Sequence, residues 1–255
     1  MVTIDHIREQ LLAGNNLKVI GSGENSAILP PHTGPELHLN PYSGILELSK
    51  PDQVFTVKAG TDLKTLNQEL AEHNLMLPIT ETHGTIGGWL ASGRPHWNEH
   101  LYGPLKDWVL GMKIMLTNGE VCKCGSQVVK NVAGYDIHRW LVGSRGVYAL
   151  ILEVTMKAYA RQELPQPPQI VKEANLIHRC LPSNIETLTQ AYQELPHALS
   201  PCRTTLFAKA SETFSSTRTE SDWIMSPWEP LHGPRLQKAK QIFDPEAKLW
   251  SGGFA

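Results

Sequence analysis

The chain has 255 residues, 41% of them hydrophobic, which is enough to bury one sizeable core or two modest ones. Its formal net charge is −2 and its Lys and Arg residues are dispersed, so we expect no nucleic-acid partner. No apolar run is long enough to predict a transmembrane segment, and the N-terminal residues lack the basic and apolar regions of a signal peptide. Four scattered cysteines do not suggest a disulfide framework, so we expect a reducing, cytoplasmic setting.

Short helices and strands alternate through the first part of the sequence. The periods of the apolar residues predict a helix at 5–13, strands at 17–20, 45–48 and 54–59, and a helix from Asp62 that carries Leu63, Leu66 and Leu70. Two further strand candidates, 109–116 and 121–124, flank Asn118-Gly119, the strongest short hairpin signal in the chain. A helix at 137–142 and a strand at 148–156 complete this part.

Prolines at 165, 167 and 168 mark a boundary near residues 161–169. Beyond it, Ser183 and Glu186 match a capping box, which predicts a helix carrying Ile185, Leu188, Tyr192 and Leu195. The remaining elements are a strand at 204–208, a polar and mobile loop at 211–222, and a helix at 234–243. Leu236, Ala239 and Phe243 form the apolar side of that last helix.

Three glycine-rich segments indicate a binding function. They are Gly21-Ser22-Gly23, the segment from Gly84 to Gly93, and the Gly-Tyr-Asp turn in 130–136. Glycine lets the backbone approach a ligand closely and leaves N–H groups free to point at it, so three such segments suggest a ligand with several parts, such as a dinucleotide. A Rossmann site is disfavoured, because Ser26 replaces the third glycine of the fingerprint and residues 28–31 (ILPP) cannot open a long helix.

Five segments carry a resemblance to a known family. They are AGTDLKTLNQELAEHNLMLP (59–78), GTIGGWLASG (84–93), KDWVLGMKIMLTNGEV (106–121), KNVAGYDIHRWLVGSRG (130–146) and, more weakly, RLQKAKQIFDPEAKLWSGGF (235–254). The pattern resembles the FAD-binding subunit of bacterial glycolate oxidase, within the vanillyl-alcohol oxidase and p-cresol methylhydroxylase (PCMH-type) flavoprotein superfamily. The resemblance implies FAD as cofactor.

The resemblance also implies a set of cofactor-binding residues, in which backbone amides hold the FAD pyrophosphate and small residues lie along the flavin. On this chain they are Gly21, Ser22, Gly23, Glu24, Asn25, Ser26, Thr85, Ile86, Gly87, Gly88, Ala91, Ser92, Gly93, Asn131, Gly134, Tyr135, Asp136, Gly146 and Ile151. Three positions depart from the family's pattern. Glu24 stands where relatives have Thr or Ser, Ala149 replaces a Gly, and Leu152 replaces a Thr.

Structural alternatives remain open at each of these segments. Gly21–Ser26 is either a phosphate loop or an ordinary strand-end turn, and Thr85–Gly88 is either a cofactor contact or a turn packed on a neighbouring helix. Tyr135 lies beside a ligand or in the core, and Asp136 suits the cap or first turn of the following helix.

Other motifs favour structural explanations. His96 and His100 have a metal-binding spacing, but Pro95 and the Gly103-Pro104 pair indicate a loop, so we expect no metal site. Cys122 and Cys124 supply at most two soft ligands from one strand, which favours half-buried thiols. Arg139 could bind a carboxylate, but a solvated helix face is the commoner explanation.

We therefore expect an α+β, PCMH-type FAD-binding fold of two subdomains over 1–160, a reduced cap at 161–233, and a segment at 234–255 that packs back on the FAD domain. The expected function is that of an FAD-binding oxidoreductase subunit that passes electrons from a 2-hydroxy acid within a glycolate-oxidase-like complex. The alternative is a non-catalytic accessory or scaffold subunit, which the departures and the short cap favour. A stand-alone oxidase is disfavoured, because no catalytic base or substrate clamp is identifiable in the sequence.

Overall fold

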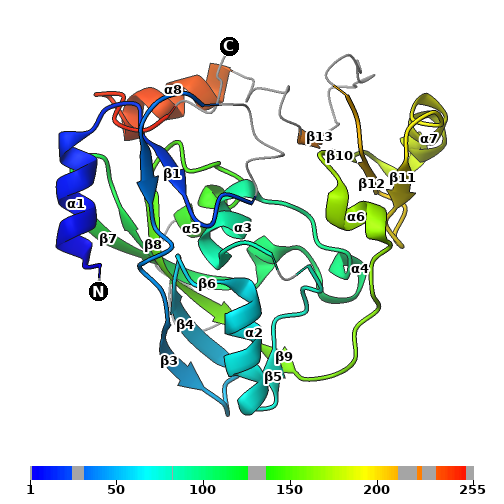
Figure 1. Cartoon of the computed structure of the whole chain (residues 1–255), viewed down its shortest axis with the longest axis horizontal. Helices are drawn as coiled ribbons and strands as arrows, with labels where there is room; N and C mark the ends of the chain where they lie inside the picture. The colour runs from blue at the N-terminus through cyan, green and yellow to red at the C-terminus, as the bar shows by residue number, and fades with distance from the viewer. Residues whose placement is uncertain are drawn as a thin grey trace.

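A computed structural model describes residues 2–24, 32–81, 83–125, 136–211, 223–225 and 234–250. Figure 1 labels its elements. The N-terminal part contains α1 (Ile4–Ala13), β1 (Lys18–Ile20), β2 (Glu36–His38), β3 (Ile45–Ser49), β4 (Val54–Lys58), α2 (Leu63–Glu72), β5 (Leu75–Met76), α3 (Ile86–Ser92), α4 (Glu99–Tyr102), the 3-10 helix η2 (Leu105–Asp107), β6 (Val109–Met115), β7 (Val121–Gly125), α5 (Ile137–Leu141), β8 (Leu150–Lys157) and β9 (Tyr159–Ala160). The C-terminal part contains α6 (Gln169–Glu173), β10 (Leu176–Arg179), the 3-10 helix η3 (Pro182–Asn184), α7 (Ile185–Ala191), β11 (His197–Leu199), β12 (Thr205–Ala208), β13 (Trp223–Met225) and α8 (Pro234–Phe243).

The central element is a five-stranded antiparallel sheet in the order β3-β4-β8-β6-β7. Its β6–β7 hairpin forms at Asn118-Gly119 as predicted, with Gly119 at φ +83. Helices α2 and α3 bury their apolar sides against this sheet, where Leu66 and Trp89 are fully enclosed. The predicted N-terminus of α2 is confirmed, because the Asp62 side chain accepts the Thr65 amide proton.

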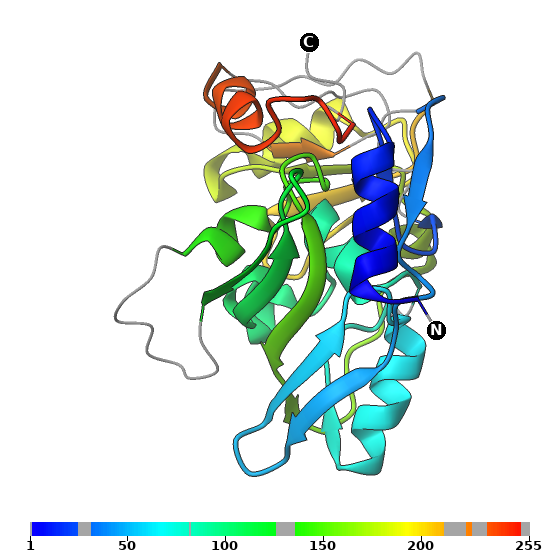
Figure 2. The same cartoon turned by 90° about the vertical axis from the view of Figure 1, so that its left-hand side faces the viewer.

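A smaller layer covers part of the opposite face of the sheet. The parallel pair β1–β2 and helix α1 lie together there (Figure 2), and their Ile7, Leu11 and Leu37 pack against Met115 and Leu150 of the sheet. The turn after β1 lies close to the start of α3, because a Cβ atom on Gly21 would lie 2.1 Å from the Thr85 hydroxyl oxygen. An isolated bridge also joins Asp62, the N-cap of α2, to Thr85, the N-cap of α3. This arrangement positions the first two glycine segments beside each other.

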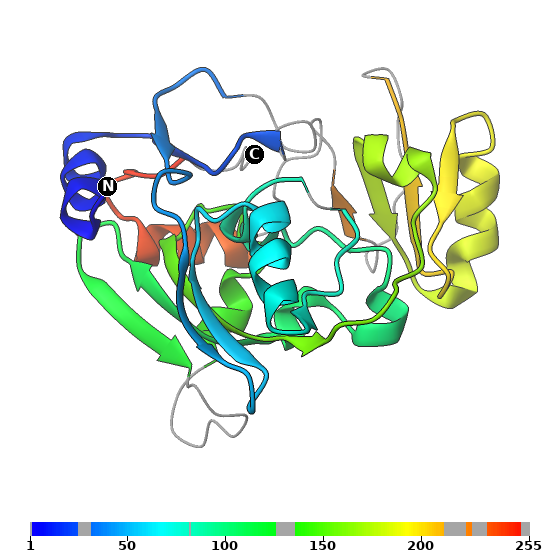
Figure 3. The ribbon, with the colours of Figure 1, turned by 60° about the horizontal axis from the view of Figure 1, so that its bottom comes forward.

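The C-terminal unit is a four-stranded antiparallel sheet, β11-β12-β10-β13, with α6 and α7 packed on it (Figure 3). The capping box predicted at Ser183 and Glu186 is wrong. Pro182 starts the 3-10 turn η3, so α7 begins after Asn184, whose side chain makes no capping bond, while the Ser183 hydroxyl donates to the Asn184 side chain at 3.0 Å. The helix ends at Ala191, and Leu195 packs on the same core from beyond its end.

Helix α8 and the residues after it return to the central sheet (Figure 1). Leu236, Ala239 and Phe243 pack against the main core, and the Thr117 hydroxyl donates to the Phe243 carbonyl at 2.9 Å. Farther along, the Trp250 amide donates to the Leu17 carbonyl at 2.7 Å. Most of the predicted loop at 211–222 lies outside the described residues. None of the helices in the described part of the chain has the length and apolar character that crossing a bilayer requires.

Candidate cofactor site

The turn that follows β1 approaches α3 more closely than any side chain would allow. A Cβ atom on Gly21 would lie 2.1 Å from the Thr85 hydroxyl oxygen, and Gly23 adopts a left-handed φ of +83. Within the described residues, the backbone amides of Ser22 and Gly23 meet no protein acceptor. The turn thus offers polar N–H groups in a place that only glycine can form.

Helix α3 supplies the facing wall. Thr85 is its N-cap, and its hydroxyl accepts the Gly88 amide proton at 3.2 Å. Gly87 has a packing role, because an added Cβ would lie 2.7 Å from the Cβ of Ala59. Gly93 ends the helix at φ +64, where an added Cβ would lie 2.7 Å from the Cα of Gly143.

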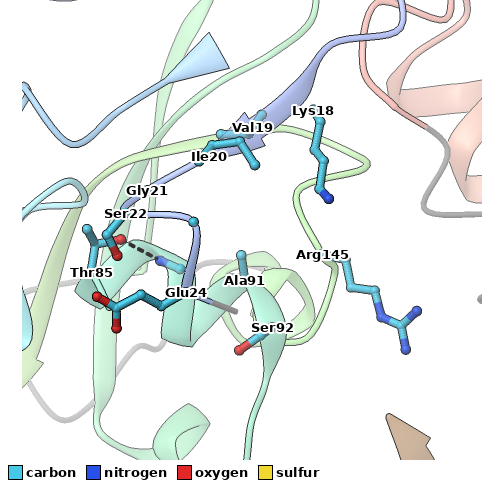
Figure 4. Close-up of a pocket in the computed structure, with 12 residues that line it drawn as sticks. Lys18, Val19, Ile20, Gly21, Ser22, Glu24, Thr85, Ala91, Ser92 and Arg145 are labelled. Carbon is cyan, nitrogen blue, oxygen red and sulfur yellow. Dashed lines mark hydrogen bonds between the residues drawn. The ribbon is translucent and has the colours of Figure 1, made fainter. Parts of the chain in front are cut away.

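Two small hollows, of about 50 and 40 Å³, adjoin at this junction and share Val19, Gly21, Thr85, Gly88 and Ala91. The first extends to Lys18, Ile20, Ser22, Gly23, Glu24, Ser92 and Arg145, and the second to Leu39, Ala59, Gly87, Gly146, Ala149 and Ile151. Figure 4 shows the first hollow, between the turn after β1 and the residues of α3.

The structure brings together eleven of the residues proposed from the sequence: Gly21, Ser22, Gly23, Glu24, Thr85, Gly87, Gly88, Ala91, Ser92, Gly146 and Ile151. Ile86 lies instead in the main core, and Gly93 packs on Gly143. Asp136 is exposed at the N-cap of α5, where its side chain makes no capping bond. Asn25, Ser26, Asn131, Gly134 and Tyr135 lie outside the described residues.

The two departures near β8 face different surroundings. Ala149 lines the second hollow, so its methyl group occupies space where the family's glycine would leave room. Leu152 is fully buried in the layer formed with α1 and β2, away from both hollows. Only the first of these substitutions changes the surface of the candidate site.

Sequence reasoning missed the cationic residues of the site. Lys18 and Arg145 are 6% and 8% exposed, and both line the first hollow. Burial lowers the pKa of Lys18, and the Glu36 carboxylate beside it acts in the opposite direction. The available signals were a lysine inside an apolar strand, and an arginine between Ser144 and Gly146.

This wall of the site fits a diphosphate. Amides without a protein acceptor and two cationic residues line the first hollow, and Glu24 supplies the one carboxylate among its lining residues. Anionic oxygens bound to N–H groups and cations are among the stronger hydrogen-bonded arrangements in proteins. The residues that would hold the diphosphate are therefore the Gly21–Glu24 turn, Thr85 and Gly88, together with the two cations.

A second polar cluster lies where the N-terminal part meets the C-terminal sheet. Arg94 donates to the Val171 carbonyl at 3.0 Å, and Glu99 forms a salt bridge with Arg179. Asn98 is buried next to these contacts, and neither its side-chain oxygen nor its side-chain nitrogen has a hydrogen-bond partner. Within the described ranges no group of three His, Cys, Asp or Glu residues could hold a metal ion.

His96 in this cluster should make stability depend on pH. Its Nε2 bonds the Gly103 carbonyl at 3.0 Å, so the buried Nδ1 is the unprotonated nitrogen and has no partner. Burial lowers the pKa of His96 to about 4, so the unfolded chain takes up its proton first as pH falls below the ordinary value. Stability should therefore be fully present above that ordinary value and fall by about 2 kcal/mol between pH 7 and 5.

Urea unfolding at several pH values tests this contribution. His96→Gln keeps an amide that can reach the Gly103 carbonyl, and should flatten the slope between pH 7 and 5. His100→Gln is the matched control, because His100 is exposed four residues away. Equal slopes in the wild type and the His96 variant would contradict a buried neutral imidazole.

A family model and a solved structure are similar to this chain. Residues 9–125 match the family model described as "FAD binding domain", so FAD is the cofactor that the family assigns to this segment. A solved alkyldihydroxyacetonephosphate synthase superposes with a TM-score of 0.50 at 16% identity, covering 75% of this chain and 35% of that one. This likeness supports the expected PCMH-type α+β fold.

Curated relatives make the resemblance more specific. Glycolate oxidase subunit GlcE of Escherichia coli (strain K12) is 31% identical over 162 residues, 62% of this chain and 46% of that protein. D-2-hydroxyglutarate dehydrogenase of Xanthomonas citri pv. viticola is 29% identical over 58% of this chain and 30% of its own length. Glycolate oxidase subunit GlcD of Bacillus subtilis (strain 168) is 28% identical over 56% and 32%. The chain therefore spans less than half the length of these relatives, and its resemblance to glycolate oxidase flavin subunits is confirmed.

Proposed function

We propose that the chain is an FAD-binding oxidoreductase subunit of a complex that oxidises glycolate or another 2-hydroxy acid. The observation that carries the proposal is the glycine-walled hollow between the β1 turn and α3, which backbone amides without a protein acceptor line. When bound, FAD supplies the redox chemistry by accepting a hydride equivalent from the 2-hydroxy acid. The names of the relatives support this class of substrate and the presence of partner subunits.

The chain's own residues would position the cofactor. The amides of the Gly21–Glu24 turn would donate to the diphosphate, and the Thr85 hydroxyl would cap the start of α3 beside that turn. Ile151 and Gly146 would form the apolar surface toward the flavin. We also propose Asn131, Gly134 and Tyr135, which lie outside the described residues, as cofactor-binding residues. We propose boundaries of 1–160 for the FAD-binding domain, 161–233 for the cap and 234–255 for the returning segment, and a cytoplasmic location.

One observation favours the alternative of a non-catalytic accessory subunit. The described cap is a small sheet whose contacts with the N-terminal part include Arg94 to Val171, Glu99 to Arg179, and the Trp97 and Phe207 rings at 6.3 Å. These residues are engaged in joining the two units. A flavoenzyme must also hold its substrate's reacting carbon against the flavin and exclude water.

We therefore expect the purified full chain, loaded with FAD, to show no appreciable turnover of glycolate or lactate by itself. Steady-state assays with an artificial electron acceptor measure this directly. A partner subunit that covers the flavin edge should be required for activity. Robust turnover by the chain alone would show that the small cap suffices and would exclude the accessory function.

A further inference from the structure

Two segments that are far apart in the sequence meet at the second hollow. Val19 of β1 and Gly146 of the turn at 143–147 both line it, and a Cβ atom on Gly146 would lie 3.6 Å from the Cβ of Val19. The hollow measures only about 40 Å³. A small change in the spacing of these two segments therefore changes the space that a ligand can enter.

Lys240 of α8 is connected to both segments. Its ammonium group has three N–H donors. They reach the Val147 carbonyl at 2.8 Å, the Leu249 carbonyl at 2.9 Å and the Asp244 carboxylate at 2.5 Å. Val147 directly follows Gly146, so the first of these bonds holds the turn that lines the hollow.

The C-terminal residues carry the second bond on to β1. Leu17, the residue before β1, forms a parallel bridge with Leu249. The Leu17 amide donates to the Lys248 carbonyl and the Trp250 amide donates to the Leu17 carbonyl, both at 2.7 Å. The Asp244 carboxylate fixes the same stretch, because it accepts the amides of Lys248 and Leu249 at 2.8 and 2.9 Å. One ammonium group thus links β1 to the turn at 143–147.

The ion pair of Lys240 and Asp244 is neutral as a unit. The two side chains are 11% and 0% exposed, and Lys240 lines neither hollow. Any effect of Lys240 on a ligand should therefore come from the positions of the two segments that it links, and not from its charge.

We propose that Lys240 is a positioning residue for FAD, which fixes the spacing between β1 and the turn at 143–147 and so the shape of the hollow between them. This inference rests on the proposed function and concerns a residue outside the glycine motifs. Removing the three hydrogen bonds should weaken FAD binding about tenfold or more, because misplacements near 1 Å have effects of that size in binding and catalytic sites.

Calorimetry on the full chain tests this, at a temperature where melting curves show every variant to be folded. Lys240→Met keeps the apolar part of the side chain and removes the donors, so it should show the loss of FAD affinity. Lys238→Met is the control for charge, because Lys238 is exposed on the same helix. Leu70→Ala is the control for stability, because Leu70 is fully buried in α2 and lines neither hollow. Both controls should bind FAD as tightly as the wild type.

Hydrogen exchange of the ligand-free chain gives a readout that does not depend on FAD. Peptides that cover 17–20 and 143–149 should exchange faster in Lys240→Met than in the wild type, whereas peptides from 63–72 in α2 should not change. If Lys240→Met does not fold, Asp244→Asn replaces it in both measurements, since it removes the charge and keeps an oxygen for the two amides.

Unchanged FAD affinity in the folded variant, or unchanged exchange at 17–20 and 143–149, would overturn the proposal. An equal loss of affinity in Leu70→Ala would also overturn it, because FAD binding would then follow stability alone. Faster exchange in the variant together with a wild type that binds no FAD would confirm that Lys240 links the two segments and would contradict the proposed function.

Discussion

Replacing Asp244 with alanine should cost the folded state about 3–5 kcal/mol. The Asp244 side chain is fully buried and lies 2.5 Å from the Nζ of Lys240. It also accepts the Lys248 amide at 2.8 Å and the Leu249 amide at 2.9 Å. Removing the carboxylate would leave the Lys240 ammonium and the two backbone amides without this acceptor. Because the site is buried, little water can replace it.

The same lysine connects α8 to the residues before β8 and to the C-terminal segment, because its Nζ donates to the Val147 carbonyl at 2.8 Å and to the Leu249 carbonyl at 2.9 Å. Chemical unfolding monitored by circular dichroism should therefore show a lower midpoint for Asp244→Ala. Glu246→Ala is the control, since that carboxylate is 76% exposed. A variant at Asp244 as stable as the control would mean that the C-terminal segment does not stabilise the fold through this network.

Gly21→Ala should reduce FAD affinity by about two orders of magnitude, as misplacements near 1 Å do in binding and catalytic sites. The new methyl carbon would lie 2.1 Å from the Thr85 hydroxyl oxygen, so either the turn or the start of α3 must move. Both walls of the hollow are made by these two segments. Fluorescence titration with FAD measures the loss, and a melting curve confirms that the variant folds.

A second substitution tests whether the loss of FAD affinity comes from the steric clash with Thr85 or from a general disturbance of the fold. Thr85→Ala removes the hydroxyl and leaves the two Cβ atoms about 3.1 Å apart. Alone it should cost about 1 kcal/mol of stability through the lost helix cap. In the Gly21→Ala background it should restore part of the FAD affinity. If the double variant binds no better than Gly21→Ala, the close approach of Gly21 to Thr85 is not what shapes the site.

Local patterns predicted most of the central sheet and its helices, because their causes lie within a few residues. Asp62 caps α2, Asn118-Gly119 turns the hairpin, and the apolar residues of 234–243 face the core. The capping box at Ser183 failed for an equally local reason, since Pro182 favours a tighter turn and moves the helix start. The periodicity of the apolar residues does not show that a 3-10 turn at Pro182 competes with the capping box for the start of the helix.

Only some of the residues that line the candidate site could be predicted from the sequence. The glycines of the turn and of α3 could be recognised, because glycine is the residue that lets the backbone approach a ligand or a neighbouring segment closely. Lys18 and Arg145 lie far apart along the chain and meet at one hollow only through the packing of β1, α3 and the 143–146 turn. Likewise, nothing in the sequence indicated that Leu152 would face away from the site while Ala149 lines it.

Titration of the purified full chain with FAD is the most direct test of the account. We predict non-covalent binding of one FAD per chain with a micromolar or lower Kd, together with a flavin absorption spectrum that is lost on denaturation and filtration. Such a result would agree with a glycine hollow built to hold a diphosphate. The absence of both a flavin spectrum and micromolar FAD binding in the wild-type chain would contradict the central claim.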